Sequence, residues 1–296
     1  MGWLIMPESK LYLPEGSRPT GPYSIEDLKA AKASGTILEG VVTRCDAQHN
    51  LHVSLGGKCT GIIPRDQAVL PAISGADREI AVLSRVGKPV CFTGTSIEAN
   101  EKGDAVVTLS RQMAQKQSLE YLMDTLEPGM VIDARVTHLE RFGAFVDIGC
   151  GIVSLLPIER ISISRISHPA ERFHQGQKIR AVVLSKDLAH QRFQLSHREL
   201  LGSWMENASH FAEGETVRGI VRSVKEYGIF VELLPNLSGL SDLKEGFAPG
   251  DCVSVFIKSI QPERMKIKLQ ILEKLPPFFP PLSYQITDGQ ISLWRY

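Results

Sequence analysis

The chain has 296 residues, enough for two or three small domains that each have their own core. Its 33 basic and 33 acidic residues balance, which argues against a strongly basic nucleic-acid-binding protein, because phosphate attraction supplies most non-specific affinity. A neutral chain can still gather its cations on one face, so nucleic acid is not excluded. No apolar run approaches the roughly 20 residues of a membrane-spanning helix, and we expect no membrane partner.

The N-terminal residues and the cysteines indicate the compartment. The segment MGWLIMPESK has an apolar patch but neither a basic leader nor a cleavage region, so we expect no signal peptide. The five cysteines are scattered and form no CxxC pair, which argues against a zinc site and a secreted disulfide framework. They are Cys45, Cys59, Cys91, Cys150 and Cys252. We expect reduced thiols in a cytoplasmic protein.

Residues 1–34 carry no repeat and are assigned as an N-terminal extension. Residues 35–112 hold the weakest of three internal repeats: GTILEGVVTRCD, from Gly35, matches GETVRGIVRSVK, from Gly214. GIIP, from Gly61, also matches SLLP, from Ser154. We expect a degenerate barrel over 35–112.

Two linkers have helical signals. SRQMAQKQSLEYLMDTLEPG ends in a Pro-Gly helix stop, which predicts a helical linker over 113–125. SHRELLGSWMENASHFAEG lies in the corresponding place between the second and third repeats and predicts a helical linker over 199–210. We expect Trp204 and Phe211 to dock on barrels rather than to contact a ligand.

The other two repeats occupy residues 126–198 and 211–273. PGMVIDARVTHLERFGAFVDI, from Pro128, aligns with EGETVRGIVRSVKEYGIFVEL, from Glu213. Both alternate apolar and other residues and are rich in valine and isoleucine, which indicates strands. Five short strands with a glycine-marked turn predict a five-stranded OB-type barrel, whose closure leaves few unpaired edges. The predicted fold is therefore mainly β, with three tandem barrels and short linker helices.

The tail, residues 274–296, has four prolines that favour an extended segment. YQITDGQISLW then places Asp288-Gly289 between two alternating runs, which predicts a β-hairpin. We expect this hairpin to pack on a barrel with Trp294 as its anchor. The alternative is a disordered tail.

The sequence aromatic–Gly–x–aromatic carries the functional prediction. It is Phe142 to Phe145 in the second barrel and Tyr227 to Phe230 in the third, with Arg141 and Lys225 beside the turns. The glycine permits a bulged backbone, so both rings can emerge on one outer face. Bases stack on such rings with about 1–3 kcal/mol each and little sequence preference. Alternatively the rings belong to the core, which is more natural for the second ring of each pair.

RFGAFVDI and EYGIFVEL resemble the S-one RNA-binding domain. That family has Asp-Phe-Gly-Ala-Phe-Val, then Gly-Leu-Val-His-Ile-Ser, then a strand pair joined by an aspartate-to-arginine turn. The resemblance covers most of residues 35–272 and is strongest in the second barrel. With its tandem copies, the chain resembles the bacterial family of ribosomal protein S-one, in a shortened form with three domains. This resemblance implies a role in translation, with single-stranded mRNA and the small ribosomal subunit as partners.

In that family, the two aromatics, the histidine and the aspartate–arginine pair form the RNA face. The resemblance therefore assigns Phe142, Phe145, Asp187 and Arg192 in the second barrel, where Pro157 stands in place of the histidine.

In the third barrel the resemblance assigns Tyr227 and Phe230, with Lys266 in the arginine position. Gln261 replaces the aspartate, and the histidine is missing. The first barrel lacks the aromatic pair, although His49 and His52 lie nearby and either stack or have no role. We therefore expect barrel two to be the main RNA contact, barrel three to assist it, and barrel one to dock on a protein.

The remaining motifs point to no chemistry. The loop ISISRISHPAERFHQ, with Arg165, His168, Arg172 and His174, either touches phosphate or is a solvated loop. Its histidines, and the others of barrel two, lack metal-ligand spacing, so we expect no metal or cofactor. No phosphate loop of the GxxxxGK type, nucleophile elbow or HExxH is present, so we expect no enzyme. An RNA-decay or transcription cofactor and a protein-interaction scaffold remain as alternatives.

Overall fold

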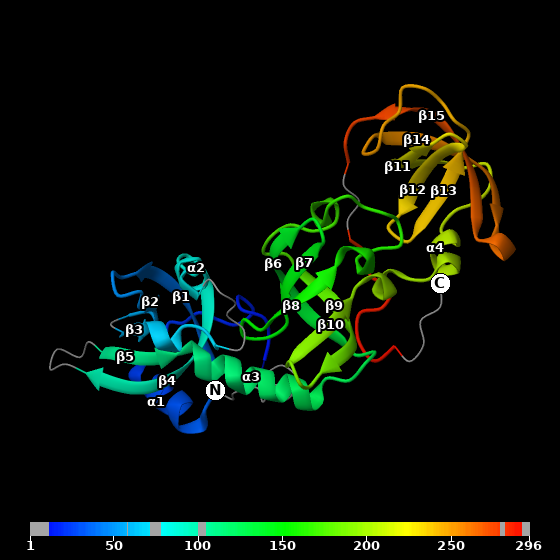
Figure 1. Ribbon diagram of the computed structural model, residues 1–296. Helices are drawn as coiled ribbons and strands as arrows, with labels where there is room; N and C mark the ends of the chain where they lie inside the picture. Colours follow the sequence, from blue (N-terminus) through cyan, green and yellow to red (C-terminus); the bar gives the residue numbers. More distant parts are fainter. Residues whose placement is uncertain (1–11, 58, 72–77, 100–104, 279–281, 292–296) are drawn as a thin grey trace.

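The computed structural model describes residues 12–57, 59–71, 78–99, 105–278 and 282–291. Within them, fifteen strands form three successive five-stranded units, which lie in a row (Figure 1). The first and third are closed barrels. The second has the strand order β10 (Arg192–Ser196), β9 (Lys178–Asp187), β6 (Val131–Glu140), β7 (Gly143–Asp147) and β8 (Val153–Pro157). The predicted mainly β fold with tandem OB-type barrels is confirmed. No helix in the described ranges is long and apolar enough to cross a bilayer.

Barrel one follows helix α1 (Ile25–Ser34), which begins at a Ser24 capping box and ends at Gly35, in the left-handed region. Parallel pairing of β3 with β5 closes the barrel around Leu51, Val53 and Leu109. A 3-10 turn, η2 (Arg65–Gln67), and helix α2 (Arg78–Leu83) lie between its third and fourth strands. The strands are β1 (Leu38–Cys45), β2 (Leu51–Ser54), β3 (Cys59–Ile63), β4 (Pro89–Ala99) and β5 (Ala105–Ser110).

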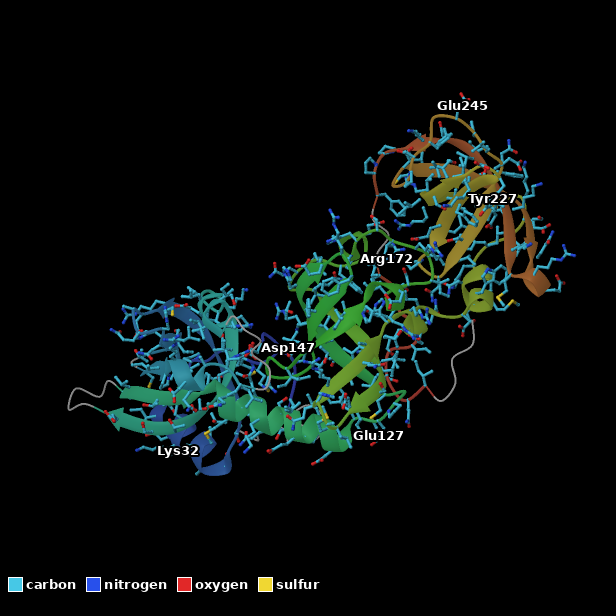
Figure 2. The ribbon with its side chains drawn as sticks, in the orientation of Figure 1. Lys32, Glu127, Asp147, Arg172, Tyr227 and Glu245 are labelled. Atoms are coloured by element: carbon cyan, nitrogen blue, oxygen red, sulfur yellow. The ribbon has the colours of Figure 1, made fainter. Side chains whose placement is uncertain are left out.

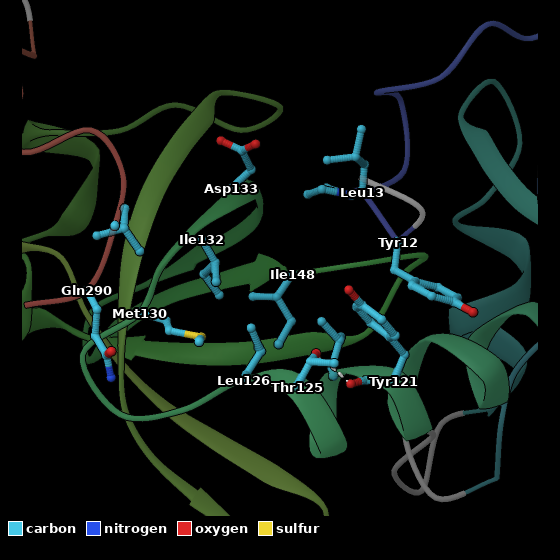
Figure 3. A pocket seen from close by; sticks show the side chains of 14 residues that line it. Tyr12, Leu13, Tyr121, Thr125, Leu126, Met130, Ile132, Asp133, Ile148 and Gln290 are labelled. Atoms are coloured by element: carbon cyan, nitrogen blue, oxygen red, sulfur yellow. Dashed lines mark hydrogen bonds between the residues drawn. The ribbon is translucent and has the colours of Figure 1, made fainter. Parts of the chain in front are cut away.

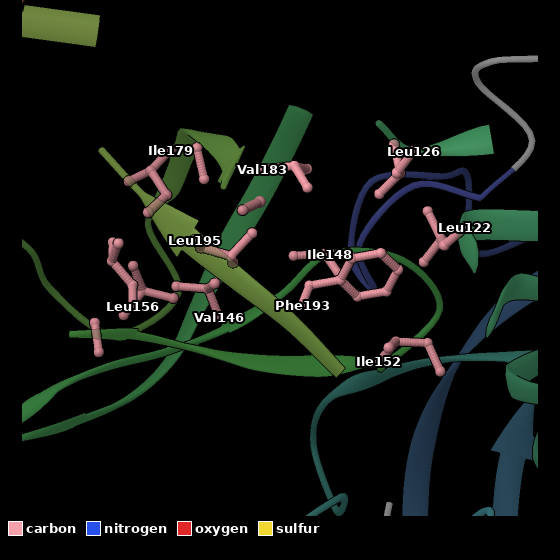
Figure 4. Packing of buried hydrophobic residues seen from close by; sticks show 14 of the residues in the cluster. Leu122, Leu126, Val146, Ile148, Ile152, Leu156, Ile179, Val183, Phe193 and Leu195 are labelled. Carbon is pink, nitrogen blue, oxygen red and sulfur yellow. The ribbon is translucent and has the colours of Figure 1, made fainter. Parts of the chain in front are cut away.

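Helix α3 (Arg111–Thr125) occupies the first predicted linker. The Ser110 hydroxyl caps it by accepting the Met113 N–H at 3.0 Å. Its buried side chains include Leu119 and Leu122, which join the core of barrel two. Figure 4 shows Leu122 and Leu126 on the side of that core where Phe193 lies. The helix therefore packs against both barrels, with Ala114 beside Cys91 of barrel one and its later turns in the core of barrel two, and is not a free linker.

Barrel two carries its core on alternate residues. Ala144 and Val146 of β7 and Leu156 of β8 are fully buried and face inward. Because successive side chains of a strand point to opposite faces, the residues between these core positions point outward. Its strands are β6 (Val131–Glu140), β7 (Gly143–Asp147), β8 (Val153–Pro157), β9 (Lys178–Asp187) and β10 (Arg192–Ser196), and its 3-10 turns are η3 (Ile158–Arg160) and η4 (Pro169–Glu171).

The second linker is two short pieces, η5 (Arg198–Leu201) and α4 (Trp204–Ala208), rather than one helix. Gly202 between them has φ +82° and ψ 160°, which no helix accommodates. Trp204 is buried in the core of barrel three and Phe211 packs against it, as predicted. Barrel three consists of β11 (Thr216–Lys225), β12 (Gly228–Leu234), β13 (Leu237–Ser241), β14 (Cys252–Gln261) and β15 (Lys266–Leu275), with the turn η6 (Pro262–Arg264) before β15.

The described part of the tail pairs with barrel two rather than with itself. The Val131 N–H donates to the Gly289 carbonyl at 3.0 Å, and the Ile291 N–H donates to the Gly129 carbonyl at 2.8 Å. Residues 129–131 bond β9 on one side, so their other side offers free peptide groups to an extended chain. This edge pairing replaces the predicted hairpin over the described residues. Its second half, with Trp294, lies outside them.

Buried charges join barrel one to barrel two. Glu15 accepts two hydrogen bonds from Arg111, at 2.6 and 2.9 Å, and both side chains are almost fully buried. The Glu15 N–H donates to the Asp147 carboxylate at 2.7 Å. Figure 2 shows Asp147 at this junction. The extension therefore links α3 to the β7–β8 turn. All five cysteines are free thiols, as the sequence predicts.

Candidate nucleic-acid interface

Phe145 lies on the outer face of barrel two. Its neighbours Ala144 and Val146 belong to the core, so alternation points Phe145 the other way. The ladder pairs it with His138 on β6 and with Leu155 on β8. The alternative that Phe145 is a core residue is therefore wrong for this ring.

Three rings form an aromatic surface at this position. Phe142, 55% exposed, stands edge-on to Phe145 with ring centroids 5.9 Å apart and an interplanar angle of 90°. His138 lies nearly parallel to Phe145, at 6.4 Å and 26°. Such a surface offers one broad platform and one wall for an unstacked base. The sequence interpretation missed His138, because period-two alternation from the buried Ala134 and Val136 would turn it inward and only the bulge after Val136 turns it outward.

Barrel three repeats the geometry. Tyr227, 68% exposed, stands edge-on to Phe230, with centroids 6.1 Å apart and an angle of 89°. Phe230 pairs with Ser223 and Leu240, and Leu240 pairs with Lys268 on β15. An exposed ammonium group thus lies in the same row as the ring. Lys268 is a second residue that the sequence interpretation missed.

The glycines of the motif permit close strand approach. A Cβ on Gly143 would lie 2.5 Å from the Leu156 carbonyl oxygen. Gly228 has φ +146°, and a Cβ there would collide with the Ser241 carbonyl. The aromatic pairs therefore emerge from a turn that needs glycine, as the sequence predicted.

The turn between β9 and β10 places Asp187 directly opposite Arg192. Asp187 accepts hydrogen bonds from the His190 ring at 2.7 Å and from the backbone N–H groups of Ala189 and His190. These bonds lower the pKa of Asp187, so the carboxylate stays charged and shapes the turn. Arg192 is exposed on the outer face. In barrel three, Gln261 and the exposed Lys266 occupy the same two positions.

Arg141 and Lys225 are both exposed but are not equivalent. Lys225 pairs with Gly228, as Glu140 pairs with Gly143. Lys225 therefore takes the place of Glu140, and the counterpart of Arg141 is Glu226. The first turn carries opposite charges at matching places in the two barrels.

Barrel one has a histidine where the others have phenylalanine. His52 pairs with Arg44 and Ile62, in the same register as Phe145 and after the same bulge in the first strand. Its Nε2 lies 3.2 Å from the Asp46 carboxylate, and its side chain is 13% exposed. His49, three residues earlier, lies 3.0 Å from Glu79. Both imidazoles lie beside carboxylates, and the His52 Nδ1 also lies 3.4 Å from a guanidinium nitrogen of Arg44.

A cavity of about 600 Å³ lies between α3, β6 and residues 12–14 (Figure 3). The rings of Tyr12 and Tyr121 meet there at a centroid distance of 4.5 Å. Its described lining contains neither lysine nor arginine. Its described lining therefore offers phosphate no cation, and the cavity is separate from the aromatic surfaces.

Residues 125–198 match the family described as the S1 RNA binding domain. Barrel two is an S1 domain. The match spans β6 to β10 and includes the aromatic surface and the β9–β10 turn. The S1 family is the one that the sequence resemblance indicated.

Relatives extend the similarity beyond this S1 domain. The chain is 31% identical over 229 residues to the small ribosomal subunit protein bS1 of Leuconostoc lactis, which covers 70% of the chain and 52% of the relative. It is 33% identical over 184 residues to the bS1 homolog of Bacillus subtilis strain 168, which covers 57% of the chain and 47% of the relative. The chain thus spans about half the length of these relatives.

The chain also matches solved structures. A crystal structure of a multidomain protein with nucleic acid binding domains, from Streptococcus pneumoniae, covers 85% of this chain and 75% of that one. The identity is 15% and the TM-score 0.25, which is too low to support a conclusion about fold or function.

Proposed function

We propose that the protein binds single-stranded RNA, in particular mRNA, in translation at the small ribosomal subunit. The observation that carries this is the exposed aromatic pair on the S1 domain, Phe142 and Phe145, with its copy at Tyr227 and Phe230. The names of the relatives supply the ribosomal context. A cytoplasmic protein that holds RNA without transforming it fits this role.

Barrel two is the stronger platform in this proposal. It has three rings on its outer face, Phe142, Phe145 and His138, and Arg192 provides a planar fork for phosphate. Barrel three has two rings and the point charges of Lys266 and Lys268. Arg141 and Lys225 add one exposed cation to each turn. Two weak sites on one chain gain affinity through effective concentration.

The test is a variant with alanine at Phe142, Phe145, Tyr227 and Phe230. Stacking contributes about 1–3 kcal/mol per base, so the quadruple variant is expected to bind a fluorescein-labelled oligouridine at least tenfold more weakly in anisotropy titrations. Met205→Ala, an exposed apolar residue on α4, is the matched control. Unchanged affinity in a folded quadruple variant, by circular dichroism, would contradict RNA binding by these surfaces.

The ranking is tested with the two pairs separately. Substituting Phe142 and Phe145 is expected to weaken binding more than substituting Tyr227 and Phe230, because only the first removes the platform that adjoins His138. The ranking is wrong if the second double variant loses more affinity in the same titration.

A protein-docking role for barrel one accompanies this function. The carboxylates that hold His49 and His52 make its face a poor RNA platform. The quadruple aromatic variant is therefore expected to co-sediment with small ribosomal subunits about as well as the native chain. Loss of co-sedimentation in that variant would mean that RNA, and not barrel one, provides the attachment.

A further inference from the structure

The loop of residues 162–172 in barrel two is attached to barrel three at its beginning. The Ile163 N–H donates to the Asn236 side-chain oxygen at 3.0 Å. The Ser164 N–H donates to the Pro235 carbonyl at 3.0 Å, and the Ser164 and Ser238 hydroxyls are 2.7 Å apart. These contacts fix the residues immediately before Arg165.

The end of the same loop is attached by buried ion pairs. Arg172 contacts Glu232 of barrel three at 2.5 Å, and these side chains are 3% and 1% exposed. Arg222 of barrel three contacts Glu232 at 2.6 Å and also pairs with Glu171 of the loop. Figure 2 shows Arg172 on the side of barrel two that faces barrel three. Arg172 is therefore occupied, so of the two arginines in this loop it is not the one available to a phosphate.

Both attachment points lie beside the aromatic surface of barrel three. On β12 the core residues are Ile229, Val231 and Leu233, so Phe230 and Glu232 share the outer face. They are two residues apart, which is roughly 7 Å along a strand. On β13, Ser238 pairs with Glu232 and Leu240 pairs with Phe230. The loop thus borders the surface formed by Tyr227 and Phe230.

Arg165 is the exposed cation of this loop. It lies between the two attachment points and, among the described residues, makes no ion pair or hydrogen bond. Arg172 and Arg222, by contrast, are neutralised by Glu171 and Glu232. Lys266 lies two residues before Lys268 on β15, which runs parallel to β13, so it is on the same outer face toward the Ser238 end, where the loop docks. Arg165 therefore adds a guanidinium group to a region that already has two ammonium groups.

We propose that Arg165 of barrel two completes the RNA site of barrel three by binding the phosphate next to the base that stacks on Tyr227 or Phe230. This rests on the proposed function. A guanidinium group forms paired hydrogen bonds with phosphate oxygens, which an ammonium group does not. The site is therefore composite, and one RNA strand on barrel three is in contact with both barrels.

The experiment measures oligouridine binding by the full-length chain carrying Arg165→Ala. We expect a three- to tenfold loss of affinity, and a fall of about 0.7 in the slope of log affinity against log salt, the value for one phosphate contact on a single strand. Arg165→Lys is expected to retain part of the affinity. Lys29→Ala, which removes an exposed charge from α1, is the control and should change neither quantity.

A double-variant comparison assigns Arg165 to its barrel. In a chain with alanine at Tyr227 and Phe230, Arg165→Ala is expected to have little further effect, because both belong to one site. In a chain with alanine at Phe142 and Phe145, its full effect should remain. The reverse pattern, or a loss no larger than that of Lys29→Ala, would overturn the inference. If the native chain does not bind the oligonucleotide at all, the proposed function itself fails.

Discussion

His197 links the tail to barrel two through a short chain of hydrogen bonds. Its Nδ1 lies 2.8 Å from the Ile161 carbonyl and its Nε2 lies 3.2 Å from the Tyr284 hydroxyl. The Arg180 N–H donates to the same hydroxyl at 3.1 Å. A neutral ring with the proton on Nδ1 satisfies all three groups. Burial lowers the pKa of His197 to about 4 and raises that of Tyr284 to about 12.

Stability is therefore expected to fall in acid. The unfolded chain takes up a proton on His197 near pH 6.5, whereas the folded chain resists until about pH 4. Stability from this residue is complete above pH 6.5 and is lost as the pH falls toward 4, by up to roughly 3 kcal/mol. Urea unfolding between pH 7 and 4.5 measures it. His197→Gln should flatten this dependence and His174→Gln, an exposed control, should not; equal slopes in all three proteins would contradict the prediction.

The outward aromatics were predictable residue by residue, but their partners were not. Phe142 and Tyr227 precede a glycine in a recognisable motif, and the structure places both rings in the open. His138 adjoins Phe145 because a bulge follows Val136 and shifts the β6 register by one residue. A bulge has no reliable local signature, so no local pattern distinguished His138 from the other histidines of barrel two.

The same bulge recurs in the first strand of every barrel. It lies between Val42 and Arg44, between Val136 and His138, and between Val221 and Ser223. In each barrel the bulge places the next residue of the first strand opposite the position of the second aromatic ring. These residues are Arg44, His138 and Ser223. The element geometry is thus common to three barrels, while the chemistry differs: phenylalanine twice and histidine once.

A methyl group on Gly143 is expected to disrupt the pairing of β7 with β8. The Cβ would lie 2.5 Å from the Leu156 carbonyl, so β7 and β8 must separate. Gly143→Ala should cost about 1–3 kcal/mol and weaken RNA binding, because Phe142 and Phe145 move with the strand. Thermal unfolding and anisotropy measure the two effects. Gly94→Ala in β4, where the nearest atom is 3.8 Å away, is the control, and equal stability of the two variants would refute the prediction.

Across the whole molecule, buried charges hold the barrels together. Glu15 and Arg111 join barrel one to barrel two, and Arg172, Arg222 and Glu232 join barrel two to barrel three. Each group alone would be costly to bury, so each depends on its partner. The row of barrels in Figure 1 is therefore maintained by specific pairs rather than by loose linkers.

Removing one member of the buried Glu15–Arg111 pair is expected to lower the stability of the chain. Arg111→Met leaves the Glu15 carboxylate buried with Arg85, at 3.3 Å, as its remaining cation. We expect a loss of about 3–5 kcal/mol in urea unfolding. The exposed Lys116→Met on the same helix should lose less than about 1 kcal/mol. Adding Glu15→Gln to Arg111→Met should recover part of the stability, and no recovery would show that the charge was not the cause.

The amino-acid sequence was enough to predict the three repeats, the period-two strands, the helix before barrel two and the exposed rings, because each is encoded in neighbouring residues. Which of the loop arginines is exposed depends instead on long-range packing. Arg165 and Arg172 are equivalent in the sequence, yet one is exposed and the other is buried against Glu232, sixty residues away. The described part of the tail likewise pairs with residues 129–131 at the edge of barrel two. Pairings of such long range depend on the packed barrels, and local patterns carry no information about them.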